Sequence, residues 1–195
     1  MSRLPRSFAE ALEGISSPDG GAAAVAHGIS ALLDAERRCG DLARAVESFR
    51  EAARVVGILE ESRNGQRIYD AWCKLSRFFL EPLDALKHEV VGDPAEVAPA
   101  PVGFETVASL WEKTGPEIVA LLEEHRALDR TLQESPTTAH VGYRVRSKLL
   151  LLDRRAERVK VALDLFRADL SRAARSGAVR LEGMLGLEAA GGGAS

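Results

Sequence analysis

The sequence predicts an all-α fold, namely an elongated antiparallel helical bundle of four to six helices with coiled-coil seams and no sheet. The first basis is composition. Aromatic residues make up only 5% of the chain and the apolar set is mainly Ala, Leu and Val, a mix that favours helices over strands. With 46% hydrophobic and 28% charged residues among 195, the chain matches a soluble globular domain with a real core.

The second basis is a pair of long apolar runs in which the spacing alternates between three and four residues. A mean spacing of 3.5 keeps an apolar seam facing a partner helix, as in coiled coils. The first seam comprises Phe104, Val107, Trp111, Thr114, Ile118, Leu121, His125, Leu128 and Leu132. The second seam comprises Val145, Leu149, Leu152, Ala156, Val159, Leu163, Phe166, Leu170 and Ala173.

The third basis is the placement of helix start and stop signals. Ser135-Pro136 offers an N-cap followed by proline in a first turn, so the two seams are expected to form an antiparallel hairpin. Thr114-Gly115-Pro116-Glu117 resembles a capping box inside the first seam. Because the heptad phase continues through it, we expect a kink there and not a chain reversal.

The chain is predicted to have five segments. These are a short amphipathic leader at 1–16, a helical first half at 17–91, a Pro/Gly linker at 92–103, the long hairpin at 104–178 and a flexible tail at 179–195. Within the first half we expect helices at about 21–38, 41–63 and 66–90. Gly40-Asp41 and Asn64-Gly65 would separate them, and Pro82 would bend the last one.

Residues 17–28, SPDGGAAAVAHG, form a glycine-rich corner that invites comparison with a phosphate or cofactor loop. A Walker loop needs a lysine next to its glycines, and the first lysine of the chain is Lys74. A dinucleotide loop needs a preceding strand, which is not expected here. The favoured interpretation is a helix start, with Asp19 as the cap.

The stretch SFAEALEGISSPDGGAAAVAHGISALLDA nevertheless resembles the N-terminus of the formiminotransferase-cyclodeaminase family. That family consists of all-helical folate enzymes with a Pro-x-Pro-Gly-Gly-Gly turn, from which the first proline and the third glycine are missing here. The resemblance implies a helical folate-type enzyme as an alternative function.

Other candidates for catalysis or metal binding are weak. None of His27, His88, His125 and His140 has a second histidine or a cysteine three or four residues away, and Cys39 and Cys73 lack metal-ligand spacing. His125 lies on a seam, where a histidine is either a tolerated core residue or a buried switch. We therefore expect no enzyme, no cofactor and no metal, and reduced cysteines in a cytoplasmic protein.

Charge is distributed unevenly along the chain. Residues 1–135 carry 15 basic and 23 acidic side chains, whereas residues 136–195 carry 11 and 6. A basic flank of the last helix is therefore a candidate docking surface for an anionic partner, although it equally suits the acidic remainder of its own fold. Its members are Arg144, Lys148, Arg155, Arg158, Arg172 and Arg175.

The alternative partner is an anionic membrane. Long kinked helices, heptad seams and a basic flank over residues 41–176, with FLEPLDALKHEVV at 79–91, resemble a small BAR-type domain. That resemblance implies a dimer of coiled coils that binds or shapes membranes. Leu4, Phe8 and Leu12 share one face of the leader and would then insert into the bilayer.

The sequence thus predicts a non-enzymatic interaction or scaffolding protein. It is expected to form a homodimer through seams that one chain does not cover fully, and to dock an acidic protein surface through the basic flank. Nucleic-acid motifs are missing, so sequence-specific nucleic-acid binding is not expected. The expected location is the cytoplasm, because no apolar run approaches the roughly 20 residues of a membrane span and the first residues lack a signal-peptide core. Peripheral membrane attachment is the alternative.

Overall fold

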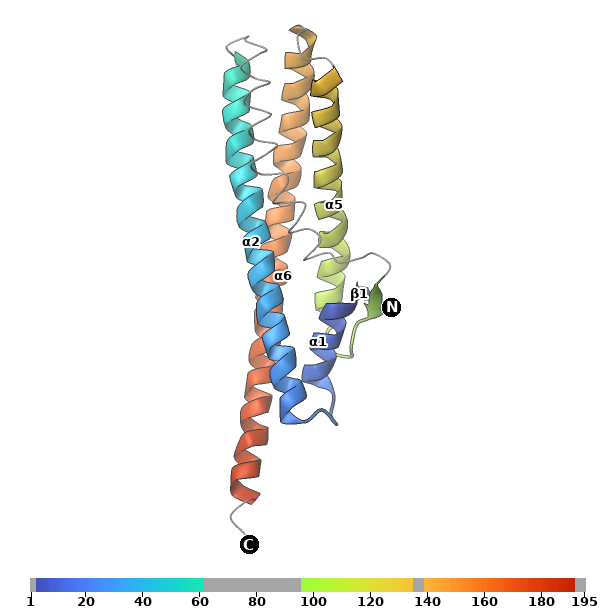
Figure 1. Cartoon of the computed structure of the whole chain (residues 1–195), viewed down its shortest axis with the longest axis vertical. Helices are drawn as coiled ribbons and strands as arrows, with labels where there is room; N and C mark the ends of the chain where they lie inside the picture. Colours follow the sequence, from blue (N-terminus) through green and yellow to red (C-terminus); the bar gives the residue numbers. More distant parts are fainter. Residues whose placement is uncertain (1–2, 62–95, 135–138, 192–195) are drawn as a thin grey trace. The chain divides into compact units, whose positions relative to one another are not determined.

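The computed structural model describes residues 3–61, 96–134 and 139–191, and it confirms the all-α class (Figure 1). Within these ranges lie four helices: α1 (Arg6–Ser16), α2 (Ala22–Glu61), α5 (Glu105–Glu134) and α6 (Ala139–Gly191). Two short strands, β1 (Arg3–Pro5) and β2 (Val97–Pro99), complete the described elements. The predicted helix at 66–90 with its bend at Pro82, and the Ser135-Pro136 cap, lie outside the described residues.

The chain divides into two compact units, which are described separately. The first unit comprises Met1–Gly40, Val90–Lys113 and Asp164–Ser195, and the second comprises Asp41–Glu89 and Thr114–Leu163. Helices α2, α5 and α6 each contribute residues to both units.

An aromatic cluster lies at the centre of the first unit. The ring of Phe8 on α1 lies 5.4 Å from that of Trp111 on α5 and 5.6 Å from that of Phe166 on α6, and the last two rings are 5.0 Å apart. Edge-on and tilted pairs at these distances are favourable beyond the area they bury. The cluster holds three helices together because each helix supplies one ring.

Glycines let the helices of the first unit approach closely. A Cβ added to Gly28 of α2 would lie 2.6 Å from the carbonyl oxygen of Ala11, and one added to Gly14 of α1 would lie 3.1 Å from that of Ala24. A Cβ on Gly177 of α6 would lie about 3.0 Å from Ile29 and Ile15. Helices α1 and α2 therefore pack as an antiparallel pair with their backbones in contact, and α6 lies against both.

The core of the second unit is formed by the predicted seams. On α5 the buried seam residues of this unit are Thr114, Ile118, Leu121, His125 and Leu128, and on α6 they are Leu152, Ala156, Val159 and Leu163. Helix α2 adds Leu42, Val46 and Phe49 to this core. The heptad interpretation is thus confirmed at the described positions of this unit, and in the first unit Val107, Trp111, Phe166, Leu170 and Ala173 are buried as well.

The predicted helix break at Gly40-Asp41 is wrong, because α2 continues from Ala22 to Glu61. A Cβ at Gly40 would lie 3.0 Å from the guanidinium of Arg167, which pairs with Glu36. The glycine therefore makes room for an ion pair between α2 and α6 and does not end the helix. Tertiary packing outweighs the local stop signal at this position.

The prediction of no sheet is also wrong in one detail. Strands β1 and β2 form a two-stranded antiparallel sheet in which Leu4 lies opposite Ala98, inside the segment expected to be a linker. The amide of Arg6 continues the pairing by donating to the carbonyl of Glu96 at 2.9 Å. Strands of three residues leave no alternating pattern in a sequence, so only the fold reveals them.

Two further expectations concern helices α5 and α6. Helix α5 runs through Pro116 without a chain reversal, as expected, and the kink there stays a prediction. Helix α6 continues to Gly191, so a helix replaces much of the flexible tail predicted from residue 179. Arg180 holds α6 here, because its guanidinium donates to the carbonyl oxygens of Ile15 and Ser17 at the end of α1.

The close contact at Gly28 generates a stability prediction. Gly28→Ala is expected to lower the free energy of unfolding by about 1–3 kcal/mol, because the methyl group collides with the Ala11 backbone. The matched control is Gly183→Ala on α6, where no atom lies within 4 Å of the added Cβ. There the gain in helix propensity, at most about 1 kcal/mol, is expected to leave stability unchanged or raised. Equal effects of the two changes in urea unfolding would contradict the packing described for α1 and α2.

Candidate interaction surface on helix α6

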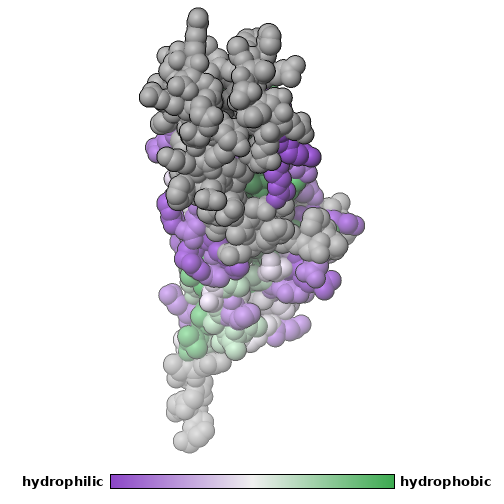
Figure 2. All heavy atoms as spheres, turned by 45° about the horizontal axis from the view of Figure 1, so that its top comes forward, coloured by the Kyte–Doolittle hydropathy of each residue, from purple (hydrophilic) through white to green (hydrophobic). Residues whose placement is uncertain are grey.

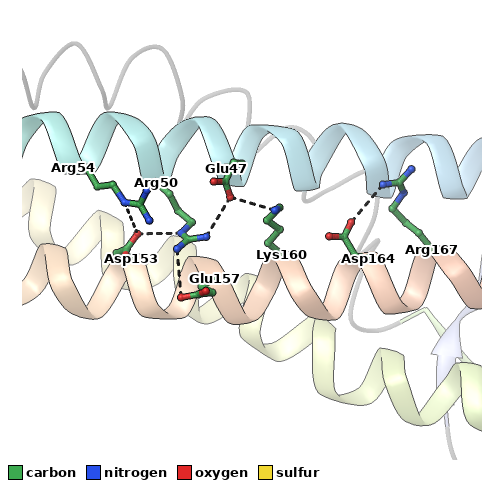
Figure 3. A network of polar contacts seen from close by, with 8 residues as sticks. All are labelled: Glu47, Arg50, Arg54, Asp153, Glu157, Lys160, Asp164 and Arg167. Atoms are coloured by element: carbon green, nitrogen blue, oxygen red, sulfur yellow. Dashed lines mark hydrogen bonds and ion pairs between the residues drawn. The ribbon is translucent and has the colours of Figure 1, made fainter.

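An ion-pair network joins α2 and α6 in the second unit (Figure 3). Arg50 of α2 is almost fully buried, and its guanidinium lies 3.0 Å from Asp153 and 3.4 Å from Glu157, both on α6. Lys160 of α6 reaches back to Glu47 of α2 at 3.6 Å. Contacts later in α2 fall earlier in α6, so the two helices are antiparallel. The network occupies the acidic side chains of α6 in this unit.

Arg155 occupies the corresponding position between α6 and α5. Its side chain is 23% exposed, and its guanidinium lies 2.8 Å from Glu124 and 3.6 Å from Glu117 of α5. Residues 139–163 of α6 carry seven basic and two acidic side chains, and the neighbouring segments 41–61 and 114–134 together carry five basic and ten acidic ones. The basic excess of this part of α6 (7 − 2 = 5) equals the acidic excess of these neighbouring segments (10 − 5 = 5), and three of their glutamates, Glu47, Glu117 and Glu124, pair with α6.

The six predicted basic residues have different environments. Arg155 is committed to α5, whereas Arg158 is 57% exposed and only approaches Glu117, at 3.6 Å. In the first unit Arg172 is 72% exposed and pairs with Asp169 one turn earlier, and exposed Arg175 donates to the carbonyl oxygen of Ser171 at 3.3 Å. Lys148 is half-buried with a partner of its own, and the side chain of Arg144 lies outside the described residues. Arg158, Arg172 and Arg175 are thus the members that present charge to solvent.

The membrane-insertion residues require a correction. Leu4, Phe8 and Leu12 are buried in the core of the first unit, with Phe8 in the aromatic cluster. Their common face packs against the protein, so insertion into a bilayer would require α1 to leave the core. No helix in the described part of the chain is long and apolar enough to cross a membrane.

Sequence reasoning missed a second feature of α6. Leu150, Leu151 and Val161 are each more than half exposed, and exposed Arg154 lies between them. With Arg158 they follow a helical spacing on the side of α6 opposite the buried seam. That spacing can be read from the sequence, but the predicted second seam already accounted for the apolar residues of this helix.

Figure 2 shows one face of the molecule, on which hydrophilic side chains cover much of the described surface and hydrophobic ones gather in a smaller area.

The glycine-rich corner at 17–28 has a packing explanation. Helix α2 begins at Ala22, and the carbonyl oxygen of Gly21 accepts from the amides of Ala24 and Val25. Gly21 therefore precedes the helix and Asp19 lies outside it, contrary to the expected cap. Neither Gly20 nor Gly21 has a positive φ, and Gly28 serves the close contact with α1. Among the described residues, no three His, Cys, Asp or Glu side chains form a group that could hold a metal ion.

Two buried titratable groups have shifted pKa values. Burial lowers the pKa of His125 to about 3, so its imidazole is neutral at physiological pH, and its ring lies 5.4 Å from that of Phe49. Burial likewise raises the pKa of the Cys39 thiol to about 12. At neutral pH this thiol stays protonated and supplies no thiolate nucleophile. Cys73 lies outside the described residues.

Comparison with known proteins yields no relative. The chain matches no protein-family model, and neither a curated protein nor a solved structure is significantly similar to it.

The different environments of Arg155 and Arg158 lead to contrasting expectations. Arg155→Ala is expected to lower the free energy of unfolding by about 1–2 kcal/mol, because two glutamates of α5 lose a part-buried charged partner. Arg158→Ala, one turn along the same helix, is expected to change it by less than about 0.5 kcal/mol because exposed pairs contribute little. Urea denaturation of both variants measures the difference, and a larger loss for Arg158→Ala would contradict these assignments.

The buried imidazole of His125 predicts a pH dependence of stability. The pKa is lower in the folded than in the unfolded state, so below the ordinary value of about 6.5 the unfolded chain binds a proton that the folded chain does not. The free energy of unfolding is therefore expected to fall by up to about 1.4 kcal/mol per pH unit as the pH drops below 6.5 towards 3. His125→Leu removes this slope between about pH 6.5 and 5, above the range where carboxylates dominate. The control His27→Leu, at an exposed site, is expected to keep it, and an unchanged slope in His125→Leu would refute the assignment.

Proposed function

We propose that this protein is a non-enzymatic interaction module that docks an acidic protein surface through the exposed arginines of α6, namely Arg158, Arg172 and Arg175. The observation that carries the proposal is the division of charge on this helix. Arg155 is committed to glutamates of α5, whereas these three arginines extend into solvent. The contacts of Arg158 and Arg175 are exposed and weak enough for a partner's carboxylates to replace, whereas Arg172 also pairs with the buried Asp169 and keeps that contact while its outer side faces solvent.

An acidic protein suits these arginines better than an anionic membrane does. Membrane attachment by exposed basic residues usually needs a second, apolar anchor. The residues expected to form that anchor, Leu4, Phe8 and Leu12, are buried in the core. Binding to vesicles is therefore an alternative outcome of the experiment below and not a part of the proposal.

Self-association is retained as a separate prediction. It was expected to occur through seams that one chain leaves open. The seam residues of the second unit are buried within one chain wherever their side chains are described, so a dimer would need the remaining seam positions or another surface. Sedimentation equilibrium over a wide concentration range tests for it.

The docking proposal predicts the outcome of affinity capture from the source cell. The wild-type chain is expected to retain an acidic protein at low salt and to release it at about 0.5 M salt, where exposed charge pairs are screened over a few ångströms. The triple variant Arg158→Glu/Arg172→Glu/Arg175→Glu is expected to lose that protein. In parallel, co-sedimentation with vesicles of anionic lipid is expected to give no pellet above that obtained with neutral vesicles.

A charge-matched control separates docking from general electrostatics. Arg37→Glu/Arg44→Glu/Arg130→Glu makes the same change in net charge at exposed arginines of α2 and α5. Two of these, like Arg172, pair with an aspartate one turn earlier on their own helix, but Asp169 is buried and Asp34 and Asp41 are not, so the thermal melts of both triple variants are compared with that of the wild type. The control is expected to keep the partner. If both triple variants lose it, or both keep it, the arginines of α6 are not the docking residues.

A further inference from the structure

The outward side of α6 in the second unit carries an apolar line with arginines in it. Leu150, Arg154, Arg158 and Val161 follow one another at intervals of four, four and three residues, and Leu151 flanks the first of them. These five residues are called the α6 outer face. It extends over about three turns, or roughly 17 Å at 1.5 Å per residue.

The exposure of this face is unusual within its unit. Of the second unit's side chains that the structure describes, the large hydrophobic ones that are exposed are Leu150, Leu151 and Val161, all on this face. Exposed apolar residues scattered singly are normal in folded proteins. Three that share one face of one helix, while the opposite face is fully buried, indicate a surface suited to contact with another apolar face.

The charges on the α6 outer face indicate which kind of apolar surface it would bind. The acidic residues of α6 in this unit, Asp153 and Glu157, contact Arg50 on the side facing α2. Glu157 is 60% exposed and borders the α6 outer face, three residues after Arg154 and four before Val161, but its carboxylate lies 3.4 Å from Arg50. With two arginines and this one bordering carboxylate, the face has a net positive charge. The face combines apolar side chains with positive charge, so its complement combines apolar side chains with negative charge.

From this combination we infer that the α6 outer face binds an amphipathic helix with an apolar stripe flanked by glutamate or aspartate. This inference rests on the proposed function, since it specifies the acidic partner. The backbone groups of α6 are hydrogen-bonded within the helix, so the face offers no edge for an added strand. The side chains of the α6 outer face recur every three or four residues. A second helix also presents rows of side chains at this spacing, so about one side chain per turn of each helix can contact the other.

A second copy of the chain fits this face less well. In a symmetric pair, each copy presents the same residues to the other. Both sides would bring Arg154 and Arg158, and the bordering Glu157 contacts Arg50 of its own chain, so like charges would meet. An acidic helix from another protein avoids that repulsion.

A synthetic peptide tests the inference directly. The probe is a helix of about 18 residues with leucine at every third or fourth position and glutamate on both flanks of that stripe. Its controls are a scrambled peptide of equal composition without a stripe, and the same stripe with lysine in place of glutamate. Fluorescence anisotropy at low salt is expected to show binding of the probe, and binding weaker by about tenfold or more for both controls.

Substitutions on the protein separate this inference from the broader proposal. Leu150→Gln/Leu151→Gln/Val161→Gln is expected to weaken probe binding by about tenfold, as is Arg154→Glu/Arg158→Glu. Leu165→Gln/Val179→Gln, at exposed apolar positions of α6 in the first unit, is expected to leave it unchanged. Circular dichroism melting of every variant is expected to match the wild type, because all these side chains are exposed.

The outcomes have distinct meanings. If the probe does not bind, or binds no better than its scrambled form, or if the leucine and valine substitutions have no effect, the inference is wrong. The docking proposal then still stands on the captured acidic protein and its sensitivity to the arginine variants. If the lysine peptide binds as well as the glutamate peptide, the charge argument fails as well, and both the inference and an acidic partner are contradicted.

Discussion

Burial of one face of α6 is the constraint on which the rest of the structure depends. In the first unit Phe166 of this face packs against Phe8 of α1 and Trp111 of α5. In the second unit its seam residues lie in the core with those of α5 and with Phe49 of α2. Each large apolar side chain buried in this way contributes roughly 1.5–3 kcal/mol. In the described part of the chain, α1, α5 and α2 each contact α6.

The arrangement of charge follows from that constraint. Because one face of α6 is buried, its charged residues lie on the flanks and on the outer side. The flanks meet α2 and α5, where Arg50 contacts Asp153 and Glu157, and Arg155 contacts Glu124 and Glu117. Pairs like these specify register and orientation more than they add stability, since desolvation offsets much of their attraction. On the outer side, solvent-facing arginines and leucines occur together.

Two buried titratable groups and the glycine-rich corner belong to the packing of the described residues. His125 lies in the core with a strongly lowered pKa, and the Cys39 thiol has a strongly raised one, so neither is poised near neutral pH. The glycine-rich corner, which invited comparison with a cofactor loop, supplies the close contact between α1 and α2 through Gly28. These features are explained by packing.

The sequence by itself determined the helical class and the buried seams, because a 3.5-residue repeat fixes which side chains share a face whatever lies opposite. It also located the arginines of α6, but not which of them pair within the fold, since Arg155 lies beside Glu124 of α5 and Arg158 only approaches Glu117.

Local signals in the sequence did not decide the structure where a contact with a distant segment was stronger. Gly40 looked like a helix stop but makes room for Arg167, and Leu4, Phe8 and Leu12 looked like an exposed apolar stripe but face the core. The three-residue strands could not be foreseen either, because their pairing joins residues far apart in the chain. Periodicity is a property of one helix and can be read from its sequence. Whether a given face is buried or exposed depends on which other segment of the chain packs against it, and only the tertiary structure decides that.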